Sequence, residues 1–512
     1  MNQRKAGVIL SYLSILANSI VMLIYIPMLL HFLTKGQYGI YQLMGSIVAY
    51  LSIMDFGLAG TTTRYLSQAM AIGDTKKSND IISTSYTLYL IIACIILVIG
   101  TIFYFCISPV YSNTLTVEDL VLAKKIFVVM LFNFTIIIPA NIFIAVINSY
   151  ERFIFIKSIN LIKVVFQPFV VWAILSYEAS ALNVVLVQSF FIVTVVIINY
   201  LYCRYKLKIR FYINLKNKQL VKSLTKFSFF IFLHSIMDQV YWRVGHLILG
   251  AVSGSLAVAN YAIAMQVAIF TNTLPVTVGS VFLPKISAII ASNKDLTEID
   301  KIFCKLGRLQ FNIVLLFFLG FVLLGKVFFI LWIGNDGGYE VCYFVSLLII
   351  FGYIVDVTQS VGNSILQALN KHPFRAYVYV VMAILNILLS IVLAKKYGEI
   401  GCAFSTMFCL LLGPGVIINW YYNKIGLNIK FFWKNLINIF GSAIVSFIVA
   451  ILLWKIYPLT NTWISFLAHG IIFVSIYSCF SWMLALNSYE KDLIRIPLNN
   501  LYIKMLNIKK ID

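Results

Sequence analysis

Charged and amide side chains occur inside apolar stretches of this sequence, and they are the residues that could do chemistry. The richest stretch, 227–251, holds His234, Asp238, Gln239, Arg243 and His246. At 100° per residue, Gln239, Arg243 and His246 share one face of a helix. His234 and Asp238 lie on a second face, and the whole polar sector is too wide to be hidden against one neighbouring helix, so we interpret it as the wall of a central cavity. The alternative is a structural Asp–Arg pair that locks two helices together.

A second polar stripe lies in the stretch 341–368. Its members follow at steps of i, i+3, i+4, i+7 and i+11, which places them on one helix face: Asp356, Gln359, Ser360, Asn363 and Gln367. The stripe predicts another cavity wall. Hydrogen bonding between neighbouring membrane helices is the alternative interpretation.

Three more polar residues are candidates for the same site: Lys163, Arg64, and Asn18 from a weaker polar stripe in the first predicted span. Lys163 lies near the middle of an apolar stretch, where it either supplies charge to a cavity or pairs with an acid such as Asp356. Arg64 ends a stretch and either contacts substrate or anchors the helix. We therefore expect substrate binding by Arg243, His246, Gln239, Lys163, Arg64, Asn18, Gln359 and Asn363, and ion coupling by Asp238 and Asp356.

The composition identifies the elements that must position these residues. Of 512 residues, 61% are hydrophobic and 11% are charged, whereas a soluble protein has about 25% charged residues. A helix needs about 20 apolar residues to cross a bilayer. The sequence predicts an all-α membrane protein with about fourteen spans, near 7–31, 38–60, 82–107, 125–148, 154–176, 181–203, 227–251, 255–283, 309–333, 341–368, 375–395, 400–422, 436–457 and 463–486.

The distribution of basic residues predicts the orientation. With the N-terminus inside, thirty of the 39 Lys and Arg residues fall in inner segments and seven in outer ones. This bias predicts cytoplasmic N- and C-termini in a bacterial inner membrane, and an even number of spans. It also accounts for the net charge of +21 without a nucleic-acid partner.

Motifs for other functions are missing from the sequence. There is no Walker A, HExxH, GxSxG or DxD motif, and no loop is long enough for a catalytic domain. The eight Cys form no CxxC and mostly lie in apolar runs, so we expect small buried side chains. We expect no catalytic residue, metal or cofactor, and favour a transporter over an enzyme.

An internal repeat is indicated at an offset of about 220 residues. At this offset Asn18 falls on Asp238, and at 222 Asn141 falls on Asn363. The unit is six spans, so the halves should be parallel repeats. We expect an N-lobe at 1–210, a C-lobe at 211–425, and two further spans with a cytoplasmic tail at 426–512.

Local sequences resemble the polysaccharide transporter family, whose members include Wzx-type O-antigen flippases. The similar segments occur in the family's order over most of residues 1–425: Tyr38–Met44, Ile53–Leu58, Thr63–Leu66, Leu247–Gly254, Val258–Ala264 and Ile365–Lys371. The resemblance implies the fold of the multidrug/oligosaccharidyl-lipid/polysaccharide exporter superfamily, with two six-helix lobes around a cavity. One departure is that Arg243 and His246 stand where such families often carry an acid, which leaves the coupling site open.

The resemblance implies a flippase for undecaprenyl-pyrophosphate-linked oligosaccharide that works by alternating access. The lipid bilayer, H+ or Na+ as coupling ion, and a polysaccharide polymerase are the partners such a function would have. A peptidoglycan-precursor flippase and a multidrug antiporter share the fold and stay open as alternatives. An O-antigen polymerase fits less well, because it would need a large outer loop.

Overall fold

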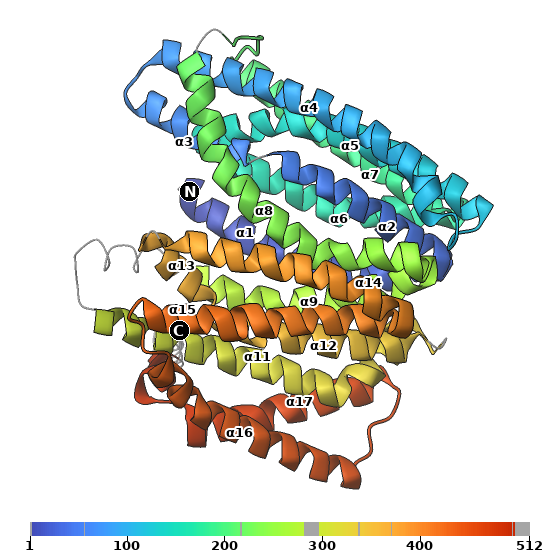
Figure 1. Ribbon diagram of the computed structural model, residues 1–512, viewed down its shortest axis with the longest axis vertical. Helices are drawn as coiled ribbons and strands as arrows, with labels where there is room; N and C mark the ends of the chain where they lie inside the picture. The colour runs from blue at the N-terminus through green and yellow to red at the C-terminus, as the bar shows by residue number, and fades with distance from the viewer. Residues whose placement is uncertain are drawn as a thin grey trace, which may run out of the picture. The chain divides into compact units, whose positions relative to one another are not determined.

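A computed structural model describes residues 3–55, 57–215, 218–280, 296–335, 338–369, 371–493 and 495–496. Within these ranges every regular element is a helix and no strand occurs. Figure 1 shows the helices in chain order. The predicted all-α class is confirmed.

The chain forms two compact units. The first comprises Met1–Ile263 with Ile387–Cys402, and the second Ala264–Asn386 with Ala403–Asp512. The first unit contains α1 (Gln3–Phe32), α2 (Lys35–Leu51), η1 (Ser52–Asp55), α3 (Leu58–Ala71), α4 (Thr75–Tyr111), α5 (Val117–Ser149), α6 (Phe153–Tyr177), α7 (Ala181–Leu201), η2 (Tyr202–Lys206) and α8 (Lys218–Val252). The second contains α11 (Leu296–Ile333), α12 (Tyr339–Thr358), α13 (Ser360–Ala368), η3 (Leu411–Ile418), α15 (Asn419–Lys424), α16 (Ile429–Ile456), α17 (Trp463–Phe480) and η4 (Ser481–Ala485). Helices α9 (Ser255–Ser280) and α14 (His372–Leu410) have residues in both units.

Within the described ranges, ten helices are long and apolar enough to cross a membrane, so this is a multi-pass membrane protein. The predicted total of fourteen spans stays a prediction. One of the ten, Pro373–Lys424, is reversed at Gly398, whose φ of 56° and ψ of −134° are not helical. That reversal agrees with the two separate spans predicted at 375–395 and 400–422.

Two predicted spans are divided rather than continuous. The span 38–60 is broken after η1, and α3 begins after Gly57, whose φ of 64° is left-handed. The span 341–368 is broken at Gln359, which separates α12 from α13. Three further segments, η2, η3 and η4, are π-helical turns at the ends of long apolar helices. The predicted span bounds therefore include these interruptions.

Side-chain caps fix where several helices begin. The hydroxyls of Thr34, Thr116 and Thr462 and the carboxylate of Asp74 each accept a hydrogen bond from a backbone N–H of the first turn. These N–H groups have no partner inside the helix, so the cap stabilises the start.

Three loops lie close together in the first unit, and the distribution of basic residues predicts all three on the outer side of the membrane. Thr114 donates to the Gly250 carbonyl at 2.7 Å. A Cβ on Gly39 would lie 1.8 Å from the Ser255 carbonyl oxygen, so only glycine permits this approach of α2 to the start of α9. These contacts place the loops near 34, 114 and 254 at one end of the unit.

Packing in the two units is organised around one helix each. In the first, α5 packs against α2, α3, α4 and α7; Figure 1 shows α4, α5 and α7 side by side. In the second, α11 packs against α12, α16 and α17. The predicted lobe boundaries and the internal repeat stay predictions.

Candidate functional site

A polar cluster in the first unit surrounds Arg243. Helix α8, which carries this residue, packs against α2. The electrostatic neighbours of the guanidinium are the hydroxyls of Tyr41 and Tyr50, both from α2. Tyr41 is also an electrostatic neighbour of Tyr25 from α1. We call Arg243, Tyr25, Tyr41, Tyr50 and the adjoining Gln188 the tyrosine–arginine cluster.

Hydrogen bonds hold part of the cluster in place. Gln188, on α7, donates its side-chain amide to the Tyr41 hydroxyl at 2.7 Å. The Tyr25 hydroxyl interacts with the side-chain amides of Gln188 and Gln167, whereas the Tyr50 hydroxyl is buried and has no hydrogen-bond partner among the described residues. All five residues of the cluster are half-buried. Part of each side chain is therefore accessible, and the Tyr50 hydroxyl has unused bonding capacity.

The cluster is suited to binding an anion. Among the described residues, no acid forms an ion pair with Arg243. An uncompensated cation at membrane depth is costly unless it faces water, a ligand or a carboxylate. A guanidinium and phenol hydroxyls can all donate to phosphate oxygens. A phosphate-bearing ligand would satisfy both the charge of Arg243 and the unused hydroxyl of Tyr50.

The residues predicted to accompany Arg243 on α8 differ in exposure. Gln239 is half-buried, and its carbonyl oxygen has no partner. His246 is only 3% exposed, and its ring meets the Tyr261 ring edge-on at 5.3 Å between centroids. The side chain of Asp238 lies outside the described residues. The structure thus places Gln239 near accessible surface and His246 inside the packed unit; their roles in substrate binding stay predictions.

The other predicted binding residues of the first unit lie on α6, α3 and α1 and are not members of this cluster. Lys163 is half-buried on α6 and Arg64 is exposed on α3. Asn18 is exposed on α1 and donates to the Ser14 carbonyl at 2.7 Å, one turn earlier. Their contact with substrate stays a prediction.

Asp356 has a cation of its own in the second unit. Its Oδ1 lies 3.0 Å from Nη2 of Arg375 and accepts a hydrogen bond of 2.6 Å from the Tyr379 hydroxyl. Arg375 also donates to that hydroxyl at 2.9 Å. Asp356 is thus paired with Arg375, whereas pairing with Lys163 is one of the two alternatives that the sequence leaves open for that lysine. Arg375 lies beyond the break between α12 and α13. The sequence pattern does not reveal this break.

The polar stripe of the second unit is largely used in contacts between helices. Gln359 is 3% exposed and exchanges two amide hydrogen bonds with Asn419, at 2.8 and 3.2 Å. Ser360 accepts from Gln310 of α11 at 2.7 Å. Asn363 is half-buried on α13. Contacts of this kind are the alternative that the sequence leaves open, so binding by Gln359 and Asn363 stays a prediction.

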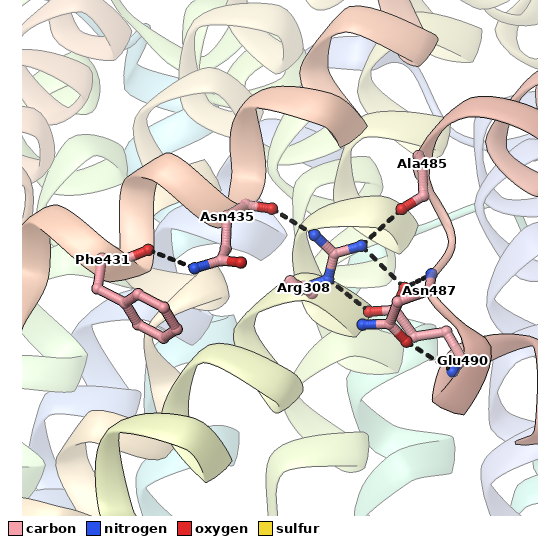
Figure 2. Close-up of polar contacts among 6 residues, drawn as sticks. All are labelled: Arg308, Phe431, Asn435, Ala485, Asn487 and Glu490. Atoms are coloured by element: carbon pink, nitrogen blue, oxygen red, sulfur yellow. Dashed lines mark hydrogen bonds and ion pairs between the residues drawn. The ribbon is translucent and has the colours of Figure 1, made fainter. Parts of the chain in front are cut away.

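A buried ion pair near the C-terminus is not evident from the sequence. Figure 2 shows the guanidinium of Arg308 against the carboxylate of Glu490, with Nε–Oε1 and Nη2–Oε2 distances of 2.7 and 2.9 Å. Arg308 also donates to the carbonyl oxygens of Ala485 and Asn435. The N–H of Asn487 donates to Glu490, and the N–H of Glu490 donates back to the Asn487 side chain. The motif Asn487-x-x-Glu490 is a capping-box pattern, which could have indicated a helix start there.

Comparison with known proteins adds to this geometry. The sequence profile of a family described as polysaccharide biosynthesis protein matches residues 5–290, more than half of the chain. The chain belongs to this family. A curated relative from Shigella flexneri, described as an O-antigen transporter, is 24% identical over 418 residues, which cover 78% of this chain and 94% of the relative.

Solved structures share the fold. A lipid II flippase, MurJ, in an inward closed conformation superposes with a TM-score of 0.71 at 16% identity, covering 95% of this chain and all of that chain. An inward-facing multidrug resistance transporter of the MATE family, in the MOP superfamily, gives 0.64 at 11% identity, covering 82% and 95%. The fold that the resemblance implied is thus the observed one.

Proposed function

We propose that this protein is a flippase that moves a lipid-linked oligosaccharide from the cytoplasmic to the outer leaflet. Membership of the polysaccharide biosynthesis family and the similarity to an O-antigen transporter support this substrate class. The observation that carries the proposal is Arg243, a half-buried cation among tyrosine hydroxyls with no acidic partner in the described residues.

The substrate in this proposal is an undecaprenyl-pyrophosphate-linked oligosaccharide, the repeat unit of an O-antigen or other surface polysaccharide. Its pyrophosphate binds Arg243, Tyr41 and Tyr50, and its prenyl tail stays in lipid while the headgroup crosses. The cycle uses alternating access coupled to H+ or Na+, and a polysaccharide polymerase receives the product. The bias of basic residues supports an inner-membrane location with both termini in the cytoplasm.

Export of surface glycan by variants tests the proposal in a host that lacks its own copy of this gene. We expect Arg243→Ala to abolish export with normal amounts of protein in the membrane. Arg243→Lys should keep part of the activity, because charge is retained while bidentate geometry is lost. Lys326→Ala, at an exposed pair with Glu340, is the matched control and should export normally. Normal export by a stably expressed Arg243→Ala protein would contradict the proposal.

A further inference from the structure

A carboxylate without a cation lies at the break in the second predicted span. Asp55 ends η1, just before the left-handed Gly57 that starts α3. Its Oδ1 accepts a hydrogen bond of 3.1 Å from the Asn141 amide of α5. No described Lys or Arg forms an ion pair with it. Asp55 therefore differs from Asp356, whose charge Arg375 neutralises.

A second group beside this carboxylate can share a proton with it. Tyr89 of α4 is fully buried, and its hydroxyl is an electrostatic neighbour of Asp55. The hydroxyl and the carboxylate interact as hydrogen-bonding groups, and no other partner of that hydroxyl occurs among the described residues. A phenol hydroxyl both donates and accepts, so it can donate to a carboxylate and accept from a carboxylic acid. Tyr89 can thus serve both protonation states of Asp55.

The remaining surroundings contain no other described titratable neighbour. Segment η1 packs against α2, α4 and α8. The described groups that interact with Asp55 are Tyr89 and Asn141. Arg243 of α8 has Tyr41 and Tyr50 as its neighbours instead, and the side chain of Asp238 is outside the described residues. Asp55 is itself half-buried, so water can reach it to exchange a proton.

We propose that Asp55 is the proton-binding group of the transport cycle, which rests on the proposed flippase function. The step is uptake of one proton from hydronium by the carboxylate, giving a carboxylic acid and water; the reverse step returns the proton to water on the other side. A single carboxylate and a proton suffice for this chemistry. Because η1 continues directly from α2, the proton site and Tyr50 of the tyrosine–arginine cluster are five residues apart on one segment.

Infrared difference spectroscopy on the reconstituted full-length protein tests this directly. A step to low pH should produce the carbonyl band of a buried carboxylic acid, and Asp55→Asn should abolish it. Asp356→Asn is the matched comparison and should keep the band, since Asp356 is ion-paired. A band that survives in Asp55→Asn would overturn the proposal, and its loss in Asp356→Asn alone would assign it to Asp356.

Two further measurements test the role of Tyr89 and the identity of the ion. Tyr89→Phe should move the pH at which the band appears, whereas Tyr86→Phe, one turn earlier on α4, should leave it unchanged. Adding Na+ at constant pH should not displace the proton; displacement would identify a sodium site and overturn the proposal. Glycan export by the wild type tests the flippase function separately, so failure of the spectroscopic result and failure of the function are distinguishable.

Discussion

Removing Arg308 should release the C-terminal helix that begins after Asn487. In Arg308→Ala, the carboxylate of Glu490, whose side chain is 1% exposed, loses its cation and two hydrogen bonds. The carbonyls of Ala485 and Asn435 lose their donor as well. Removing one partner of a buried ion pair costs about 3–5 kcal/mol, because the other charge stays buried without compensation. At tenfold per 1.4 kcal/mol, the released state should become roughly two to three and a half orders of magnitude more populated.

Hydrogen–deuterium exchange of the backbone amides of residues 487–493 measures this population. Exchange in a locally opened segment follows the free energy of opening, so the rates should rise with the released fraction. Glu490→Gln, which removes the charge but keeps the shape, should give a smaller increase. Lys326→Ala removes half of an ion pair whose side chains are 53% and 52% exposed, and should change nothing. Unchanged exchange at 487–493 in Arg308→Ala would refute the reasoning.

The packing of Gly39 and the charge pattern of the loops can be tested as well. Gly39→Ala should destabilise the protein by about 1–3 kcal/mol, because its Cβ would overlap the Ser255 backbone, as a lower unfolding temperature would show. Gly60→Ala, where the added Cβ meets nothing within 4 Å, is the control; a gain of roughly 0.5–1 kcal/mol is expected from helix propensity. Cysteines at Asn113 and Glu151 should differ in labelling from outside the cell, with only Asn113 reached; the reverse result would invert the proposed orientation.

The class of fold could be predicted from the sequence because the apolar runs are long and the basic residues alternate between loops. Helix breaks were harder to predict. Gly57 lies inside a predicted span, and nothing in the types of Gln359 and its neighbours marks a break. The break becomes stable because Asn419, sixty residues later, completes the hydrogen bonds of Gln359. The residues around Gln359 give no sign of a partner that lies so far along the chain.

The candidate site could be predicted in part. Arg243 stands out because a cation in an apolar run is costly, and this holds for any fold. Its tyrosine neighbours could not be predicted, because Tyr41 and Tyr50 look like ordinary aromatic residues of a membrane helix until α2 and α8 are packed together. The distribution of basic residues marks Arg308 only as one of the residues on the inner side. Its partner Glu490 is 182 positions away in the sequence, so no local pattern joins the two residues. Pairings over such distances depend on tertiary structure and are absent from local patterns.

The π-helical segment η3 has a consequence for how related sequences should vary. A π turn closes its hydrogen bond around one residue more than an α turn. Deleting one residue between Gly415 and Asn419 would restore an α-helical turn, and would shorten by one residue the spacing at which Asn419 donates to the carbonyls of Pro414 and Gly415 while it bonds Gln359. During divergence, a one-residue gap in this segment should therefore be accompanied by a change at position 359 or 419. The length of η3 and the amide side chains at positions 359 and 419 should be inherited together.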